Sequence, residues 1–110
     1  MQAQGLYLGE FEQIVLLAVL RLGDDAYAIP IRQEIEQRTG RNVARGALYT
    51  ALERLEEKRC LRSRMSAPLP ERGGRSRRYF TVTAAGLAAL RASRASLLNL
   101  WQGIEEQLES

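Results

Sequence analysis

The fold is decided by a stretch in the middle of the chain, which reads ARGALYTALERLEEKRCLRSRM over residues 44–65. In its first part, leucines recur at spacings of three and four, which predicts an amphipathic helix over residues 44–58. The period then changes to two, because arginines alternate with Leu61, Ser63 and Met65, and this is typical of a β-strand. The stretch therefore predicts a helix followed directly by a strand.

A second strand is predicted over residues 78–82, where the side chains again alternate between two sides. The segment that joins the two strands, residues 66–77, contains two prolines, the pair Gly73-Gly74 and several arginines. Proline and glycine favour turns, so we expect a β-hairpin with a long, basic loop.

Two helices are predicted upstream of the central stretch. The first runs from Glu10 to about Leu22 and is apolar on nearly all sides in its second half. A helix of this kind is buried on two faces, so we expect its second face to pack against a partner chain. The second helix is predicted over residues 26–39, and its buried face is expected to be formed by Tyr27, Ile31 and Ile35.

Downstream of the hairpin, one long helix is predicted from Thr83, as its N-cap, to about Glu109. Along it, apolar residues repeat with the spacing of a coiled-coil seam that one arginine interrupts. The small core cannot cover this stripe, so we expect it to form a dimer interface together with Phe11 of the first helix. The seam positions are Leu87, Leu90, Arg94, Leu97, Trp101, Ile104 and Leu108.

Three helices followed by a two-stranded hairpin is the element order of a winged helix-turn-helix. We therefore expect a mainly α fold with a small β-hairpin and a long C-terminal dimerisation helix. Residues 1–83 would form the DNA-binding region and residues 84–110 the dimerisation helix, together in one compact domain, which fits a length of 110 residues.

The positive charge of the chain is concentrated in its middle third. Residues 41–78 carry a net charge of +7, almost entirely from arginine, whereas residues 1–40 carry −3 and residues 79–110 carry −1. A local cluster of arginines is the electrostatic pattern expected for contact with phosphate. The alternative is an arginine-rich surface that only faces solvent.

Candidate DNA-binding residues lie on the third helix and in the hairpin loop, or wing. An arginine can hold guanine with two hydrogen bonds, whereas Tyr and Thr hydroxyls more often contact phosphate. Each feature has an alternative interpretation without DNA. Tyr49 would then be an aromatic residue of the core, Thr50 a residue that only faces solvent, and the wing a loop tip that only adds solubility. The candidates are Arg45, Gly46, Tyr49, Thr50 and Arg54 on the helix, and Arg72, Arg75, Arg77 and Arg78 on the wing.

The composition argues against an enzyme, a metal site or a membrane protein. The chain has no histidine and one cysteine, Cys60, so neither the commonest general base nor a usual zinc site can be built, and no cofactor is expected. We expect Cys60 to fill space beside the hairpin, with a redox role as the alternative. No apolar run approaches about 20 residues and the first residues do not resemble a signal peptide, so a cytoplasmic location is expected.

Several stretches resemble the PadR family of bacterial transcription regulators. They are residues 8–12, the pair Ala26-Tyr27, residues 46–58 and, most specifically, the wing with the residues after it, 72–86. The resemblance covers the chain from about Leu8 onward, with one C-terminal helix as in the short subfamily.

The resemblance implies a homodimer that binds a pseudo-palindromic operator, usually represses, and in some members responds to a small molecule. By position, Gly46 and Tyr49 fall on the family's glycine and tyrosine at the start of the third helix. Arg75, Arg77 and Arg78 fall on its basic wing. Arg59 stands where the family usually has glycine, so either this residue is strained or the turn differs. Ala28 likewise replaces a common glycine, which leaves the start of the second helix open.

Two further alternatives concern partners. Trp101 is expected in the dimer core, but with Leu97 and Phe11 it would also suit the wall of a pocket for a small apolar effector. Arg94 either sets the register of the seam between the two helices or extends its guanidinium to the solvent-exposed edge of that seam.

A function of another class is a winged helix that serves as a protein-interaction module and binds a different chain through its C-terminal helix.

Overall fold

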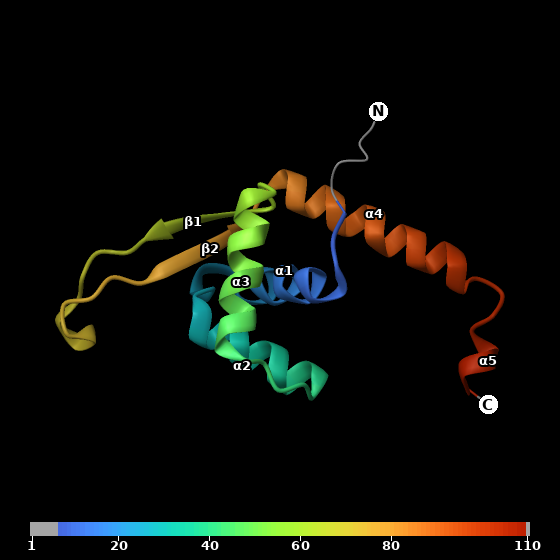
Figure 1. Cartoon of the computed structure of the whole chain (residues 1–110), viewed down its shortest axis with the longest axis horizontal. Coiled ribbons are helices and arrows are strands. Elements are labelled where there is room, and N and C mark those ends of the chain that lie inside the picture. The colour runs from blue at the N-terminus through green and yellow to red at the C-terminus, as the bar shows by residue number, and fades with distance from the viewer. Residues whose placement is uncertain (1–6, 110) are drawn as a thin grey trace.

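The computed structural model describes residues 7–109 and confirms the winged-helix order, with the hairpin extending away from the helices beside α3 (Figure 1). No helix in this part of the chain has the length and apolar character needed to cross a membrane. The elements are α1 (Glu10–Leu22), the 3₁₀ turn η1 (Gly23–Asp25), α2 (Ala28–Thr39), α3 (Arg45–Glu57), β1 (Leu61–Met65), the 3₁₀ turn η2 (Pro70–Arg72), β2 (Arg78–Val82), α4 (Ala84–Trp101) and α5 (Glu106–Glu109).

The core lies where α1, α2 and α3 pack together against the base of the hairpin. Each helix buries the apolar residues that recur at helical spacing, because these positions share one face. The apolar residues of α1, predicted to be buried on two faces, differ in their burial within the single chain. Val15, Leu16 and Val19 are buried, whereas Leu17 and Leu20 are exposed. The largest fully buried side chains are Leu16, Ile31, Ile35, Leu48, Leu52, Leu55, Val15 and Cys60.

The two strands form an antiparallel hairpin in which Leu61 lies opposite Val82 and Arg64 lies opposite Tyr79. Because side chains alternate along a strand, one face carries the buried Leu61 and Phe80 toward the core. The outer edge of β2 is also paired, since the Phe80 amide donates a 2.9 Å hydrogen bond to the Ala26 carbonyl. The wing is therefore anchored to the segment that precedes α2.

This anchoring corrects the predicted start of the second helix. Residues 23–25 form a 3₁₀ turn, Ala26 stays outside any helix, and α2 begins at Ala28 instead of residue 26. Tyr27 is the N-cap of α2 and has extended backbone angles, so it does not lie with Ile31 and Ile35 on the buried face. The physical reason is the hydrogen bond from β2, which requires the Ala26 carbonyl to point toward the hairpin.

The predicted C-terminal helix is also too long. The structure ends α4 at Trp101, and only residues 106–109 return to helix as α5. Gly103 has a φ of 89°, a left-handed conformation that ends helices and that the spacing of the apolar residues did not reveal. Ile104 and Leu108 therefore do not continue the helix that carries Leu97 and Trp101.

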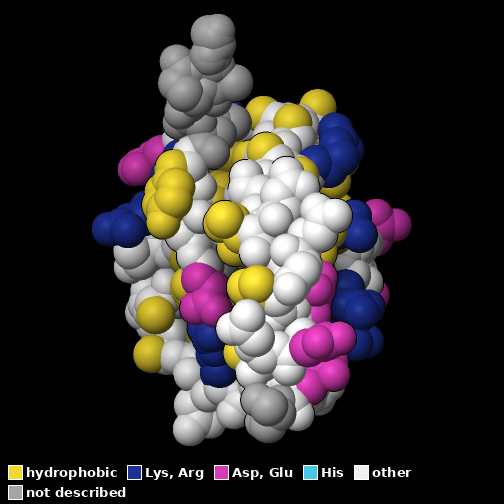
Figure 2. All heavy atoms as spheres, turned by 90° about the vertical axis from the view of Figure 1, so that its right-hand side faces the viewer, with side chains coloured by type: hydrophobic (Ala, Val, Ile, Leu, Met, Phe, Trp, Pro, Cys, Tyr) yellow, Lys and Arg dark blue, Asp and Glu magenta, His cyan; other side chains and the backbone are white. Residues whose placement is uncertain are grey.

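The second half of α4 leaves the core and carries exposed apolar side chains (Figure 1). All residues from Arg94 to Trp101 are exposed. Figure 2, which looks onto this end of the molecule, shows hydrophobic side chains between charged ones. Helical geometry places Leu97, Leu98, Leu100 and Trp101 on one broad side of α4, with Ala95, Ser96 and Asn99 on the other.

Arg59 lies in the turn between α3 and β1, at the position where the family resemblance implies glycine. Arg59 has a φ of 63°, so the turn is kept and the arginine adopts a left-handed conformation. That conformation costs an L-residue roughly 1–2 kcal/mol. Arg59 is thus a strained position whose side chain is exposed.

We expect Arg59→Gly to raise the free energy of unfolding by about 0.5–1 kcal/mol, because relief of strain exceeds the added entropy of the unfolded chain. Arg59→Ala is the matched control, since it removes the same side chain and charge but keeps the strain. Urea denaturation of the three proteins measures the difference. An equal gain in both variants would show that the charge, and not the backbone, is responsible.

Candidate nucleic-acid interface

One side of α3 faces solvent along its whole length and the other side is buried in the core. Leu48, Ala51, Leu52 and Leu55 form the buried side. All five candidates on this helix are exposed: Arg45, Gly46, Tyr49, Thr50 and Arg54. Tyr49 is 48% exposed, so the alternative of a core aromatic is wrong.

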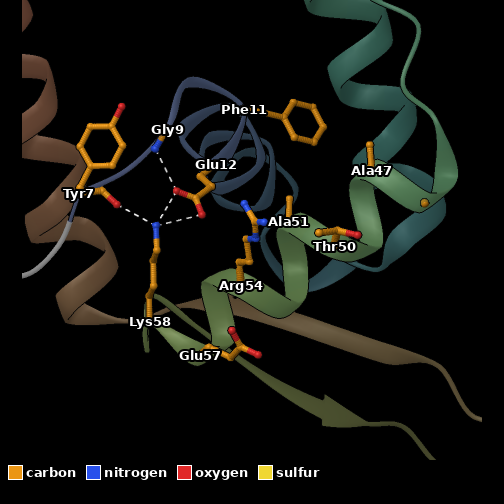
Figure 3. Close-up of a pocket in the computed structure, with 11 residues that line it drawn as sticks. Tyr7, Gly9, Phe11, Glu12, Ala47, Thr50, Ala51, Arg54, Glu57 and Lys58 are labelled. Carbon is orange, nitrogen blue, oxygen red and sulfur yellow. Dashed lines mark hydrogen bonds and ion pairs between the residues drawn. The ribbon is translucent and has the colours of Figure 1, made fainter.

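A hollow of about 780 Å³ lies between the start of α1 and the exposed side of α3 (Figure 3). Tyr7 and Phe11 line it from one side, and Thr50 and Arg54 line it from α3. The hollow leaves the middle of α3 accessible, because no other described element covers these side chains. Thr50 and Arg54 are therefore reachable by a large partner.

At one end of this hollow, Glu12 ties the start of α1 to the end of α3. The Lys58 ammonium lies 2.7 Å from Glu12 Oε1 and also donates to the Tyr7 carbonyl, and the Gly9 amide donates to Glu12 (Figure 3). Burial by itself would raise the pKa of Glu12. The hydrogen bonds from Lys58 and Gly9 and the charges of Lys58 and Arg54 outweigh burial, so the pKa of Glu12 is lowered.

We expect Glu12→Gln to lower the free energy of unfolding by about 1–2 kcal/mol at neutral pH, because it removes the carboxylate that pairs with the Lys58 ammonium. A lowered pKa contributes stability above the unfolded value, near 4.5, and this stability is lost as pH falls through the folded pKa. The difference from wild type should therefore shrink below about pH 4.5 in denaturation curves. Glu10→Gln is the control, since Glu10 is 75% exposed in its surface pair with Arg41 and should change little.

On the wing, the structure divides the candidate arginines into two groups. The first group uses its guanidinium N–H donors within the protein. Arg72 donates to Ser66 Oγ at 3.0 Å and to the Ala67 carbonyl at 2.9 Å, which closes the loop. Arg78 pairs with Glu56 at the end of α3 and thereby links the base of the wing to this helix.

The second group faces outward or rests on aromatic rings. Arg75 is exposed at the loop, and within the described residues its side chain makes one hydrogen bond, a long one of 3.3 Å to the Arg72 carbonyl. The Arg77 guanidinium lies 4.1 Å from the centre of the Tyr27 ring. Hydrogen bonding with the Tyr79 hydroxyl is the main reason that the pKa of Arg77 is raised.

Sequence reasoning missed two residues of the wing and its base, Arg64 and Glu56. Arg64 was assigned only to a strand, although its position opposite Tyr79 follows from the hairpin register and could have been found. Glu56 was treated as part of a helix end, yet it accepts hydrogen bonds from Ser63 and Arg78. No sequence signal pointed to Glu56, because its partners come from two different strands.

The residues predicted to line an effector pocket do not meet within one chain. Phe11 faces α3 in the hollow of Figure 3. Leu97 lines a separate groove between the start of α1 and α4, and Trp101 lines neither of these two hollows. A shared pocket therefore needs a second copy of the chain, and it stays a prediction.

Cys60 is completely buried directly before β1, and burial raises the pKa of its thiol. A buried thiol with a raised pKa is a poor nucleophile, so these features favour the space-filling interpretation over a redox role. Within residues 7–109, no cluster of three or more Cys, Asp or Glu side chains is arranged to hold a metal ion.

The chain is similar to known regulators in sequence and in structure. The model of the transcriptional regulator PadR-like family matches residues 16–92. No curated protein matches the chain. A PadR family transcriptional regulator from Eggerthella lenta is 26% identical with a TM-score of 0.69, covering 92% of this chain and 88% of its own. A PadR-like transcription factor from Bacteroides fragilis is 26% identical with a TM-score of 0.70, covering 87% of each chain.

A third structure supports the fold alone, because its identity is low. It is a PadR-like transcriptional regulator from Bacillus cereus, 18% identical with a TM-score of 0.71, covering 91% of this chain and 92% of its own. The family match spans most of α1, the helices α2 and α3, the whole wing and the first half of α4. The chain therefore belongs to the PadR-like family of transcriptional regulators, whose members are not enzymes.

Proposed function

We propose that the chain is a sequence-specific repressor that binds a pseudo-palindromic DNA operator as a homodimer in the cytoplasm. The observation that carries the proposal is the exposed side of α3 with the arginine-bearing wing beside it. A helix of this size fits the major groove, which is about 12 Å wide, and a wing reaches the backbone next to it.

Each candidate residue has a role in this proposal. Arg45 stands at the first position of α3, where the helix dipole favours phosphate and an arginine reaches base edges. Gly46 lets the backbone approach DNA, since nothing lies within 4 Å of the place where a Cβ would be. Tyr49, Thr50 and Arg54 extend the contact along the helix. Arg75 and Arg77 hold the flanking backbone, while Arg72 and Arg78 shape the wing and add charge.

The dimer is proposed from the exposed apolar side of α4, which the chain itself does not cover. Large exposed apolar patches commonly mark interfaces. The proposed interface residues are Phe11, Leu87, Leu90, Arg94, Leu97, Trp101, Ile104 and Leu108. Of these, Leu97, Trp101, Ile104 and Leu108 are exposed apolar residues, whereas Phe11 and Leu90 pack partly against the chain's own core. In such a dimer, Trp101, Leu97 and Phe11 are proposed to approach a small apolar effector that releases the DNA.

Selection from a randomised duplex library, at near-physiological salt and read by sequencing, tests the proposal. A two-fold symmetric site with half-sites about one helical turn apart is the expected result. Strongly salt-dependent binding without any enriched sequence would overturn sequence-specific recognition. The absence of any DNA binding would favour the alternative function, a winged-helix module that binds another protein chain. Measuring the oligomeric state of the protein alone would then test that alternative.

We expect the double variant Arg75→Ala/Arg77→Ala to bind all duplexes more weakly. Each arginine that contacts a phosphate releases counterions from the DNA on binding, and the variant would release fewer of them. The slope of log affinity against log salt should fall by about 2 in magnitude. Titrations at several salt concentrations measure this. Arg91→Ala, which removes one charge from exposed α4, is the control and should leave the slope unchanged. An unaltered slope in the double variant would contradict the wing assignment.

A further inference from the structure

Four side chains from three segments of the chain form one stacked group on the wing. The Arg64 guanidinium lies 4.8 Å from the centre of the Tyr79 ring, directly across the hairpin. The Tyr79 ring meets the Tyr27 ring edge to face, with 5.4 Å between the ring centres. The Arg77 guanidinium covers the other ring at 4.1 Å. We call Arg64, Tyr79, Tyr27 and Arg77 the stacked group.

Stacking holds a guanidinium by its face and leaves its edge available. The N–H donors of arginine lie in the plane of the group, so an aromatic ring beneath it does not use them. Within residues 7–109, no carboxylate or carbonyl accepts a hydrogen bond from the side chain of Arg64 or Arg77. The hydroxyls of Tyr79 and Tyr27 take donors of Arg77, and its remaining donors stay available. Arg72 and Arg78 differ, because protein oxygens already occupy their donors.

The stacked group lies on the same surface as the start of α3. Tyr27 is followed directly by Ala28 and Ile29, and these two residues line a shallow hollow with Arg45 and Tyr49. The start of α2 thus connects the stacked group to the exposed side of α3. The core-facing side of the hairpin, with Leu61 and Phe80, is the other face.

We propose that Arg64 and Arg77 form a clamp for a DNA phosphodiester and that Tyr27 and Tyr79 are positioning residues for the clamp. The inference rests on the proposed function and names two arginines and two tyrosines that act together. A planar fork of donors matches the two free oxygens of a phosphodiester. Because the rings restrict the arginines before DNA arrives, less side-chain entropy is lost on binding.

Tyr27→Leu tests the positioning role, because it removes a ring and no charge. We expect affinity for a duplex of random sequence to fall about fivefold, the range that loss of a cation–π contact predicts. Tyr27→Phe keeps the ring and should bind within about twofold of wild type. Both variants are compared with wild type by thermal unfolding, so that loss of fold is not read as loss of binding.

A double-mutant cycle between Tyr27→Leu and Arg77→Ala separates positioning from a general effect. Tyr27→Leu should cost little further affinity once Arg77 is absent, because the ring then has no guanidinium to hold. Equal costs of Tyr27→Leu in both backgrounds would overturn the proposal. Wild-type protein that binds no DNA would instead refute the proposed function itself, so the two failures are distinguishable.

Arg62 offers a matched control that does not depend on the tyrosines. It lies on β1 two residues before Arg64, on the same face of the strand and likewise exposed, but it stacks on no ring among the described residues. Arg64→Ala and Arg62→Ala remove the same charge and neither disturbs the core. We expect at least about a threefold greater loss of affinity for Arg64→Ala. Equal losses would overturn the proposed clamp.

Discussion

Replacing Gly86 with alanine is expected to destabilise the protein more than any other single methyl added to the described glycines. An added Cβ would overlap the backbone carbonyl of Cys60 and come within 2.9 Å of Val82 Cγ1. The carbonyl cannot yield easily, because it accepts a 3.0 Å hydrogen bond from the Thr83 amide. We expect the free energy of unfolding to fall by about 3 kcal/mol, at the upper end of the cost of overpacking.

Gly46→Ala is the matched control for this change. Gly46 also lies in a helix, but no atom lies within 4 Å of its Cβ position. Alanine there should therefore stabilise by up to about 1 kcal/mol, from its better helix propensity. Thermal unfolding should place the Gly86 variant more than about 10 °C below wild type and the Gly46 variant at or above it. A Gly86 variant as stable as wild type would show that α4 does not approach β1 this closely.

The junction at Gly86 also shows how much of the fold the sequence could predict. Thr83 was predicted as the N-cap of the last helix, and its Oγ1 accepts a 3.0 Å hydrogen bond from the Gly86 amide. Local patterns of this kind depend on residues three or four apart, so they can be read directly. The close contact between Gly86 and Cys60 joins distant segments, and no local pattern reveals it.

The two errors in the predicted helix bounds have different causes. The start of α2 is displaced because Ala26 bonds to β2, a partner more than fifty residues away. The end of α4 was missed for a different reason: the apolar spacing continued through Gly103, and spacing alone ignores the left-handed conformation that glycine adopts there. Periodicity predicted which residues share a face, but not where the backbone leaves the helix.

In the candidate site, sequence alone located the charge but not its organisation. The cluster of arginines between residues 41 and 78 was evident from composition along the chain. Arg78 and Arg77 both lie over aromatic rings, those of Phe80 and Tyr27, but only Arg78 has its donors taken by a carboxylate, that of Glu56, and this difference depends on tertiary contacts. These contacts determine which guanidinium groups remain available to phosphate.

The second large effect is expected from Leu97→Glu, which places a charge in the proposed dimer interface. Leu97 is 51% exposed in the single chain, so the variant should fold as a monomer without difficulty. In the dimer, the carboxylate would be buried against apolar side chains without a partner, which is strongly unfavourable. We therefore expect the variant to be monomeric by sedimentation at concentrations where wild type is a dimer.

Loss of the dimer should have a larger effect on DNA binding than any single contact to DNA. A dimer engages two half-sites, and the second half-site binds as an intramolecular partner at high effective concentration. Leu97→Glu should therefore weaken binding to the selected operator by at least about 100-fold, while binding to an isolated half-site stays similar. Asn99→Glu is the matched control, because it adds the same charge on the opposite side of α4. If both variants stayed dimeric and bound equally well, the apolar side of α4 would not be the interface, and the hypothesis of a different partner chain would replace the homodimer.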